Sequence, residues 1–251
     1  MPTDHEERDE NGKLLTRFQM EDGALHGEFV QYGETEKQIA HRASYQKGKL
    51  HGLSITYDPE GREVERSSFE DGLLHGETKL FDENGKLSQV VTFVKGEQHG
   101  PTRLYEDGRL RTLLLFEKGK QNGPFQSFDE QGGEVVRSFY KNGKLEGESL
   151  FLDGKGNTLR KAHYKADKLH GEVIEYFPDG EVRERATYDD GKKQGDTFSY
   201  DVNGKLKAKA TYKDGEKRGE VEYDDKCLPK SKSEEKETSF FDKIVNKLAG
   251  G

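Results

Sequence analysis

The chain contains a single cysteine, Cys227, and no tryptophan, and only 30% of its 251 residues are hydrophobic. One cysteine excludes a framework of intrachain disulfides and favours a reducing compartment. The small apolar fraction stands beside 36% charged residues, which leaves little material for a thick core between two packed layers. The composition therefore favours a thin sheet with large solvent-exposed faces.

Long hydrophobic runs and an excess of positive charge are also lacking. No stretch approaches the run of about 20 apolar residues that spans a bilayer, and residues 1–7 lack the basic start and apolar run of a signal peptide. The formal charge of −8 provides no global basic field to attract phosphates. We therefore expect a cytoplasmic protein that does not bind nucleic acid.

Glycine and aromatic residues are abundant, with 30 Gly, 11 Tyr and 14 Phe, and they recur at a fixed period of 23 to 25 residues. An aromatic or Met slot is occupied by Met20, Tyr45, Phe69, Phe93, Phe116, Tyr140, Tyr164, Tyr188 and Tyr212. A first glycine follows three residues after nearly every slot, with Asp167 as the exception, and a second glycine follows after four more. Self-similarity at one fixed period indicates stacked copies of a single small unit.

One unit, residues 69–92, predicts a β-hairpin. A short run from Glu77 to Phe81 is followed by the turn Asp82-Glu83-Asn84-Gly85 and by a second run from Lys86 to Phe93. Asp, Asn and Gly suit tight hairpin turns because they tolerate positive φ or bond to the local backbone. A second aromatic series closes the first strand of each hairpin, broken once by Leu152, at Tyr32, Tyr57, Phe81, Tyr105, Phe128, Tyr176 and Tyr200.

The units predict an all-β fold, an elongated repeat array of β-hairpins that forms a single twisted antiparallel meander. A lone hairpin is marginal in water, so each unit must bury its aromatic stripe against the next. We expect a half-repeat or cap over residues 1–19, nine repeats over 20–223, a charged linker over 224–238 and an amphipathic helix over 239–251. A bulge or longer turn at Gly33-Glu34-Thr35 would absorb one extra residue.

The chain resembles MORN repeats (membrane occupation and recognition nexus) in the bacterial variant found in antitoxin-like proteins. The matching segments include YQKGKLHGLSITYDPEGREV from Tyr45, FEDGLLHGETKLFDENGKL from Phe69 and YDDGKKQGDTFSYDVNGKL from Tyr188. The resemblance covers roughly residues 12–223. It implies protein binding, with toxin neutralisation or immunity as one family role.

No catalytic, cofactor or metal site is predicted. Five histidines precede the second glycine, but one per unit places them about 10 Å apart along the array, too far to share a metal ion. These are His26, His51, His75, His99 and His170. The repeat aromatics are expected to be structural or to anchor a partner: Tyr45, Tyr57, Phe69, Phe81, Phe93, Tyr105, Phe116, Phe128, Tyr140, Tyr164, Tyr176, Tyr188, Tyr200 and Tyr212.

The predicted C-terminal helix carries an apolar face formed by Phe240, Phe241, Ile244, Val245 and Leu248. Three roles are open: this face covers the last repeat, docks on a partner, or makes weak membrane contact, for which only Lys243 and Lys247 are available to anionic lipid.

Two functional hypotheses follow from the sequence. The first is a non-enzymatic, antitoxin-like or immunity-like module that binds one protein, possibly basic, by a broad acidic sheet face. The alternative is a structural scaffold or membrane-proximal spacer with the C-terminal helix as its attachment point. The sequence does not identify the partner, the binding face or the oligomeric state.

Overall fold

The computed structural model describes residues 1–230, which contain twenty β-strands and no helix. The all-β class and its antiparallel hairpin repeats are therefore confirmed for the described residues. The expected helix over 239–251, with Phe240, Phe241, Ile244, Val245 and Leu248, lies outside them. The chain divides into two compact units, Met1–Leu169 and His170–Gly251.

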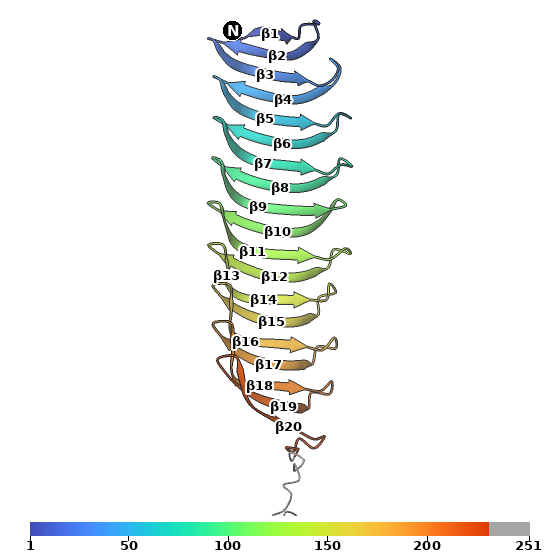
Figure 1. The fold of residues 1–251 in the computed structure, drawn as a ribbon, viewed down its shortest axis with the longest axis vertical. Helices are drawn as coiled ribbons and strands as arrows, with labels where there is room; N and C mark the ends of the chain where they lie inside the picture. Colours follow the sequence, from blue (N-terminus) through green and yellow to red (C-terminus); the bar gives the residue numbers. More distant parts are fainter. Residues whose placement is uncertain (231–251) are drawn as a thin grey trace, which may run out of the picture. The chain divides into compact units, whose positions relative to one another are not determined.

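The first unit is an antiparallel meander in which successive strands pair along the chain, with one exception at β13 (Figure 1). Its strands are β1 (Thr3–Arg8), β2 (Leu14–Glu21), β3 (Ala24–Tyr32), β4 (Ile39–Gln46), β5 (Lys49–Tyr57), β6 (Glu63–Glu70), β7 (Leu73–Phe81), β8 (Leu87–Val94), β9 (Glu97–Glu106), β10 (Arg109–Glu117), β11 (Lys120–Phe128), β12 (Glu134–Lys141), β13 (Lys144–Leu145), β14 (Gly147–Leu152) and β15 (Thr158–Lys165). Both β13 and β14 pair with β12, because residue 146 interrupts what is one strand in the other repeats.

The second unit continues the same pattern. Its strands are β16 (Lys168–Tyr176), which begins two residues before the boundary, β17 (Val182–Asp189), β18 (Lys192–Tyr200), β19 (Leu206–Lys213) and β20 (Glu216–Glu222). Each pairs antiparallel with the next.

The hairpin turn within each repeat is usually closed by an aspartate. In the turn after β7, Asp82 Oδ1 accepts the backbone N–H groups of Asn84 and Lys86, both at 2.9 Å, and the N–H of Gly85 bonds to the Asp82 carbonyl. Gly85 adopts a φ of 74°, which only glycine reaches without steric cost. The predicted turn chemistry is therefore confirmed, and the side of the sheet where these turns lie is called the aspartate-turn edge.

The opposite side of the sheet carries two-residue turns that contain the first glycine. In the turn after β6, Asp71 and Gly72 both have positive φ, 51° and 84°, as the favoured hairpin turns require. Asp167, the exception in the glycine slot, keeps this geometry with a φ of 73°. The N–H of Gly72 donates to the Leu50 carbonyl of the preceding repeat at 2.8 Å, so these turns also join successive repeats.

The second glycine lies inside a strand, which corrects one prediction. The run expected to begin at Glu77 begins at Leu73, because β7 continues through Gly76. Gly76 has a φ of 99° and lies directly opposite Phe93, beside a register shift that marks a bulge. Glycine allows this conformation, and a Cβ added at Gly76 would lie 3.3 Å from Ser68 Cβ on the preceding strand.

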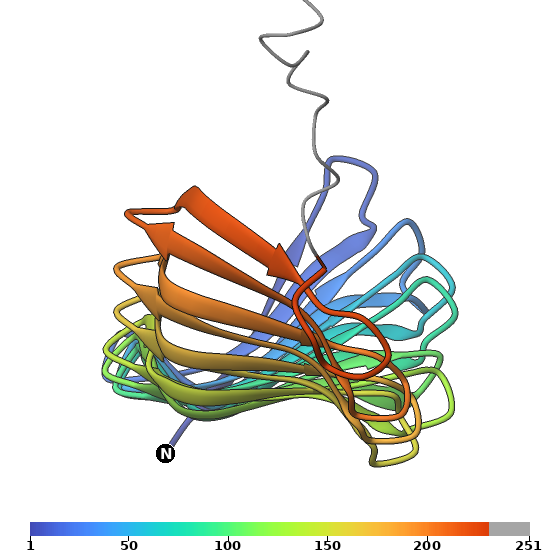
Figure 2. The ribbon, with the colours of Figure 1, turned by 90° about the horizontal axis from the view of Figure 1, so that it is seen from below.

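Small side chains form the buried centre of one sheet face. In the first unit these residues are 9% exposed or less: Ala43, Ser67, Thr78, Val91, Thr102, Ser138, Ser149 and Ala162. In the second unit the equivalents are Val173, Ala186, Thr197 and Ala210. The strands of each unit are curved (Figure 2), so a single layer can bury this row beneath larger neighbours on the same face.

Two irregular segments depart from the repeat. Residues 33–38 form the expected longer turn, closed by bonds from the Gly33 N–H to the Gln38 carbonyl (2.7 Å) and from the Gln38 N–H to the Thr35 carbonyl (3.0 Å). Residues 224–228, placed in the predicted linker, form one more aspartate turn, with Cys227 at a φ of 57° where other repeats have glycine.

Candidate functional site

The fourteen repeat aromatics are all half-buried and pack against the sheet. Tyr45, for example, lies opposite Gly27 and packs edge-on against Phe29, with ring centroids 5.9 Å apart. Phe125 and Tyr140 form the same kind of contact at 5.9 Å. These rings cover the buried small residues on their own face.

The polar slot before the second glycine joins adjacent repeats. His51 Nδ1 faces the backbone N–H of Asp71 in the next repeat at 3.5 Å, and Asn122 Oδ1 accepts the N–H of Asn142 at 3.2 Å. In the second unit, Gln194 Oε1 accepts the N–H of Asp214 at 3.0 Å. Histidine, asparagine and glutamine thus occupy the same role at His51, Asn122 and Gln194. The other histidines of the row differ, since Nδ1 of His26, His75 and His170 lies 3.1–3.3 Å from the carboxylates of Glu21, Glu70 and Asp189, respectively.

A row of cations runs along the middle of the other sheet face, which we call the cation-row face. Cross-strand pairing aligns Arg17, Val30, Arg42, Ile55 and Arg66, and the row continues into later strands. Its cations in the first unit are Arg17, Arg42, Arg66, Lys79, Arg103, Arg137 and Lys161. The aliphatic stems of such side chains cover neighbouring apolar residues, and Val30 is only 1% exposed.

Carboxylates two residues away on the same face neutralise most of this row. Glu28 contacts Arg17 at 3.9 Å and Arg42 at 3.3 Å. Glu148 lies 2.6 Å from the Lys161 ammonium. In the second unit, the hydrogen bond from Lys209 lowers the pKa of Asp196, which keeps that carboxylate charged.

Many of the remaining acids lie in turns. The aspartate-turn edge of the first unit carries Asp9, Glu10, Asp58, Glu60, Asp82, Glu83, Asp129, Glu130 and Asp153. The acidic side chains of the first unit that lie outside the ion pairs of the cation row are therefore concentrated at this edge.

Strands β9–β12 depart from the charged pattern, and sequence inspection missed the departure. The position that holds Glu28, Glu77 and Glu148 in other repeats holds Pro101 and Pro124 here. Phe139, which lies opposite Pro124, is 46% exposed. Comparison of each repeat with its neighbours at this one position is the sequence signal that could have revealed these residues.

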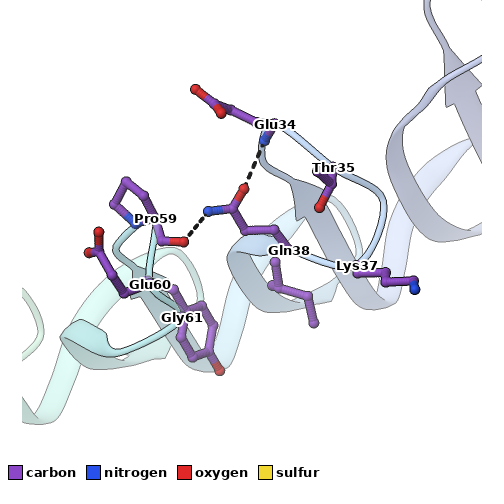
Figure 3. A pocket seen from close by; sticks show the side chains of 9 residues that line it. Glu34, Thr35, Lys37, Gln38, Pro59, Glu60 and Gly61 are labelled. Atoms are coloured by element: carbon purple, nitrogen blue, oxygen red, sulfur yellow. Dashed lines mark hydrogen bonds between the residues drawn. The ribbon is translucent and has the colours of Figure 1, made fainter.

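An open hollow of about 650 Å³ lies at the aspartate-turn edge, where the longer turn meets the next one. Figure 3 shows Gln38 between the two turns: its Oε1 accepts the Glu34 N–H at 3.0 Å, and its Nε2 donates to the Pro59 carbonyl. The hollow's other lining residues include Ile39, Tyr57 and Glu60. The glutamine bridge occupies the gap between turns, so we assign it a structural role.

His41, on β4, is partly buried in the sheet. Burial lowers the pKa of His41, partly opposed by the negative charge of Glu65. Its Nε2 lies 2.8 Å from Ser54 Oγ, and its ring lies 6.2 Å from the Phe29 ring. The histidine is thus a packed member of the sheet.

Within residues 1–230, no three side chains of His, Cys, Asp or Glu gather closely enough to hold a metal ion. The same residues include no helix long and apolar enough to cross a membrane.

Four segments of the chain match the family described as "MORN repeat variant", at residues 74–95, 135–153, 169–190 and 193–214. The chain therefore contains MORN-type repeats, as the sequence predicted. No curated protein matches the chain.

Solved structures show only distant likeness. S. aureus TarM is 14% identical over 52% of this chain and 20% of that one, with a TM-score of 0.25. A TcdB2-TccC3 structure is 12% identical over 88% of this chain and 14% of that one (TM-score 0.24). The Photorhabdus luminescens Tc holotoxin pore is 13% identical over 90% of this chain and 13% of that one (TM-score 0.20). The chain thus spans a fifth or less of these structures, and the low scores inform neither fold nor function.

Proposed function

We propose that this chain is a non-catalytic protein-binding module, antitoxin-like or immunity-like in role. The observation that carries the proposal is that each repeat uses one set of residues to build the sheet and exposes another set to solvent. Glycines, aromatics and small residues form the turns, the bulges and the buried row, whereas the charged side chains of the cation-row face and of the turn edges are exposed to solvent. Repeat proteins commonly use such extended surfaces to bind other proteins.

The acidic aspartate-turn edge supports a protein partner. Most of the cation row is neutralised by carboxylates of its own face, so complementary charge at this edge can steer and orient an incoming protein. In this proposal the module binds its partner by charge complementarity and, once bound, blocks the partner's surface sterically. The module acts in the cytoplasm.

Affinity capture tests the proposal. The full chain and a version ending at Thr238 are used as bait in native lysate, and retained proteins are identified by mass spectrometry. A single stoichiometric partner held by both forms supports binding by the repeats, and a partner lost on truncation moves the site to residues 239–251. The association rate with that partner should fall as salt is added. A salt-independent rate would contradict charge steering.

The scaffold alternative rests on a separate observation. Backbone hydrogen bonds join most first-glycine turns to the previous repeat, such as Gly48 N–H to the Leu25 carbonyl at 2.8 Å and Gly96 N–H to the Leu74 carbonyl at 2.8 Å. This repeated coupling suits a spacer whose length is the functional variable. If no specific partner is captured by either form, the scaffold function is favoured.

A further inference from the structure

Five apolar side chains lie together on the cation-row face of strands β9–β12. Leu115 lies opposite Pro101, and Phe139 lies opposite Pro124. Leu113 precedes Leu115 by two residues and therefore shares its face. We call Pro101, Leu113, Leu115, Pro124 and Phe139 the apolar patch.

The repeat fold itself explains part of the patch. Each proline follows the second glycine, where the bulge leaves the N–H outside the ladder; in the first repeat the equivalent N–H, that of Glu28, bonds to the Gln19 side chain at 3.2 Å. A proline at this position therefore removes no backbone hydrogen bond between strands. Leu115 packs over Gly123, whose added Cβ would lie 2.7 Å from Leu115 Cδ2.

Phe139 has no comparable structural task. Phe139 precedes the second glycine of its repeat, Gly147, by the same number of residues as Leu115 precedes Gly123. A Cβ added at Gly147, however, would meet no atom within 4 Å. The Phe139 side chain is 46% exposed, and it is the one aromatic among the exposed large hydrophobic residues of the described chain. Other repeats use Ser44 and Ser68 at this position. An exposed aromatic that its own fold does not need points to a partner.

The charges around the patch indicate what that partner carries. Arg103 and Arg137 flank it, with side chains 35% and 57% exposed. Arg103 is 3.7 Å from Glu77, and Arg137 contacts Glu134, but the two carboxylates that would stand beside them in other repeats are replaced by Pro101 and Pro124. Carboxylates from outside the chain would restore the pattern seen along the rest of the row.

We propose that the apolar patch is the docking site for a partner-protein segment in which leucine or aromatic side chains stand beside carboxylates. Phe139 and Leu115 contact the partner's apolar side chains, and Arg103 and Arg137 contact its carboxylates. This inference rests on the proposed protein-binding function and narrows it to one face and one partner chemistry.

The test uses the full chain and two fluorescent twelve-residue peptides, one of Glu, Leu and Phe and one with each Glu replaced by Lys. Fluorescence anisotropy should show binding of the Glu peptide only, weakened by salt. The double variant Phe139→Ser/Leu115→Ser, which installs the residue of Ser44 and Ser68, should weaken binding at least about tenfold. Arg137→Gln should weaken it several-fold and reduce the salt dependence.

Leu53→Ser is the matched control, because Leu53 is 45% exposed on the same face outside the patch and its loss should leave binding unchanged. Equal binding of both peptides, or an equal effect of Leu53→Ser, would overturn the proposal. So would a dimer in sedimentation that Phe139→Ser dissolves, since the occupant would then be a second copy. Peptide binding seen only after Phe240→Ser/Phe241→Ser would assign the patch to the chain's own C-terminal segment.

The two proposals fail in distinguishable ways. A partner captured equally by the wild-type chain and the Phe139→Ser/Leu115→Ser variant leaves protein binding intact and overturns the patch as its site. Capture lost in that variant but kept in Leu53→Ser supports both.

Discussion

At the scale of single residues, the pairing of an aromatic side chain with a glycine explains most of the repeat signature. The second glycine takes positive φ at a bulge and has an aromatic residue directly opposite, as Gly76 has Phe93. A side chain at the glycine would instead meet a residue of the preceding strand, which for Gly76 is Ser68 at 3.3 Å. The tolerance of each glycine to substitution then depends on what lies beside it.

Alanine substitution should distinguish two second glycines. Gly123→Ala places a Cβ 2.7 Å from Leu115 Cδ2 and 3.1 Å from Leu115 Cβ, whereas Gly147→Ala meets no atom within 4 Å. Both have positive φ, 123° and 78°, which costs an alanine on the order of 1–3 kcal/mol. Overpacking should make Gly123→Ala worse by about a further 1–3 kcal/mol in urea unfolding.

Leu115→Ser provides the control for that comparison, because it removes the side chain that the new Cβ would strike. In the Gly123→Ala background it should recover part of the lost free energy of unfolding. Equal destabilisation by Gly123→Ala and Gly147→Ala would show that conformational strain alone sets the cost.

At the scale of the structural element, the aspartate turn sets the register of most hairpins. Its carboxylate accepts two backbone N–H groups, and the same arrangement recurs from Asp9 to Asp224. The turn tolerates Cys227 in place of glycine, at a φ of 57°. The carboxylate thus holds the turn even where a residue less suited to positive φ closes it.

Asp82→Ala should destabilise the first unit, because two N–H groups lose their acceptor at 2.9 Å. The expected loss is about 1–2 kcal/mol in the free energy of unfolding. Glu83→Ala is the matched control within the same turn and should change stability by less than about 0.5 kcal/mol, as is usual for surface substitutions. A similar loss in both variants would mean that turn charge, rather than the side-chain bonds, stabilises the hairpin.

At the scale of the whole molecule, the question is whether length or a particular repeat carries function. Each repeat contacts mainly its neighbours, so a whole repeat can be removed at a seam without disturbing the others. Deleting residues 58–81 joins Tyr57 to Asp82, and deleting residues 106–128 joins Tyr105 to Asp129. Both junctions recreate the natural aromatic–aspartate step.

Binding of the captured partner should discriminate between these deletions. Removal of 58–81 keeps all five residues of the apolar patch, so affinity should be retained within a few-fold, whereas removal of 106–128 takes out Leu113, Leu115 and Pro124 and should weaken it at least about tenfold. A scaffold would instead lose function by degrees and equally in both. Circular dichroism and sedimentation of each variant establish that it is folded before affinities are compared.

The sequence by itself determined the repeat period, the hairpins, the positions of the turns and the longer turn at residues 33–38. These features depend on local chemistry. An aspartate followed three residues later by a glycine, as at Asp82 and Gly85, favours a tight turn, and side chains along a strand alternate between its two faces. Only the tertiary structure decided that Gly76 sits within a strand, that the repeat aromatics are half-buried, and that Phe139 lies exposed beside Pro124. Each of these depends on which residues face one another across strands, and that register couples positions about 15 to 20 residues apart through bulges that no local pattern displays.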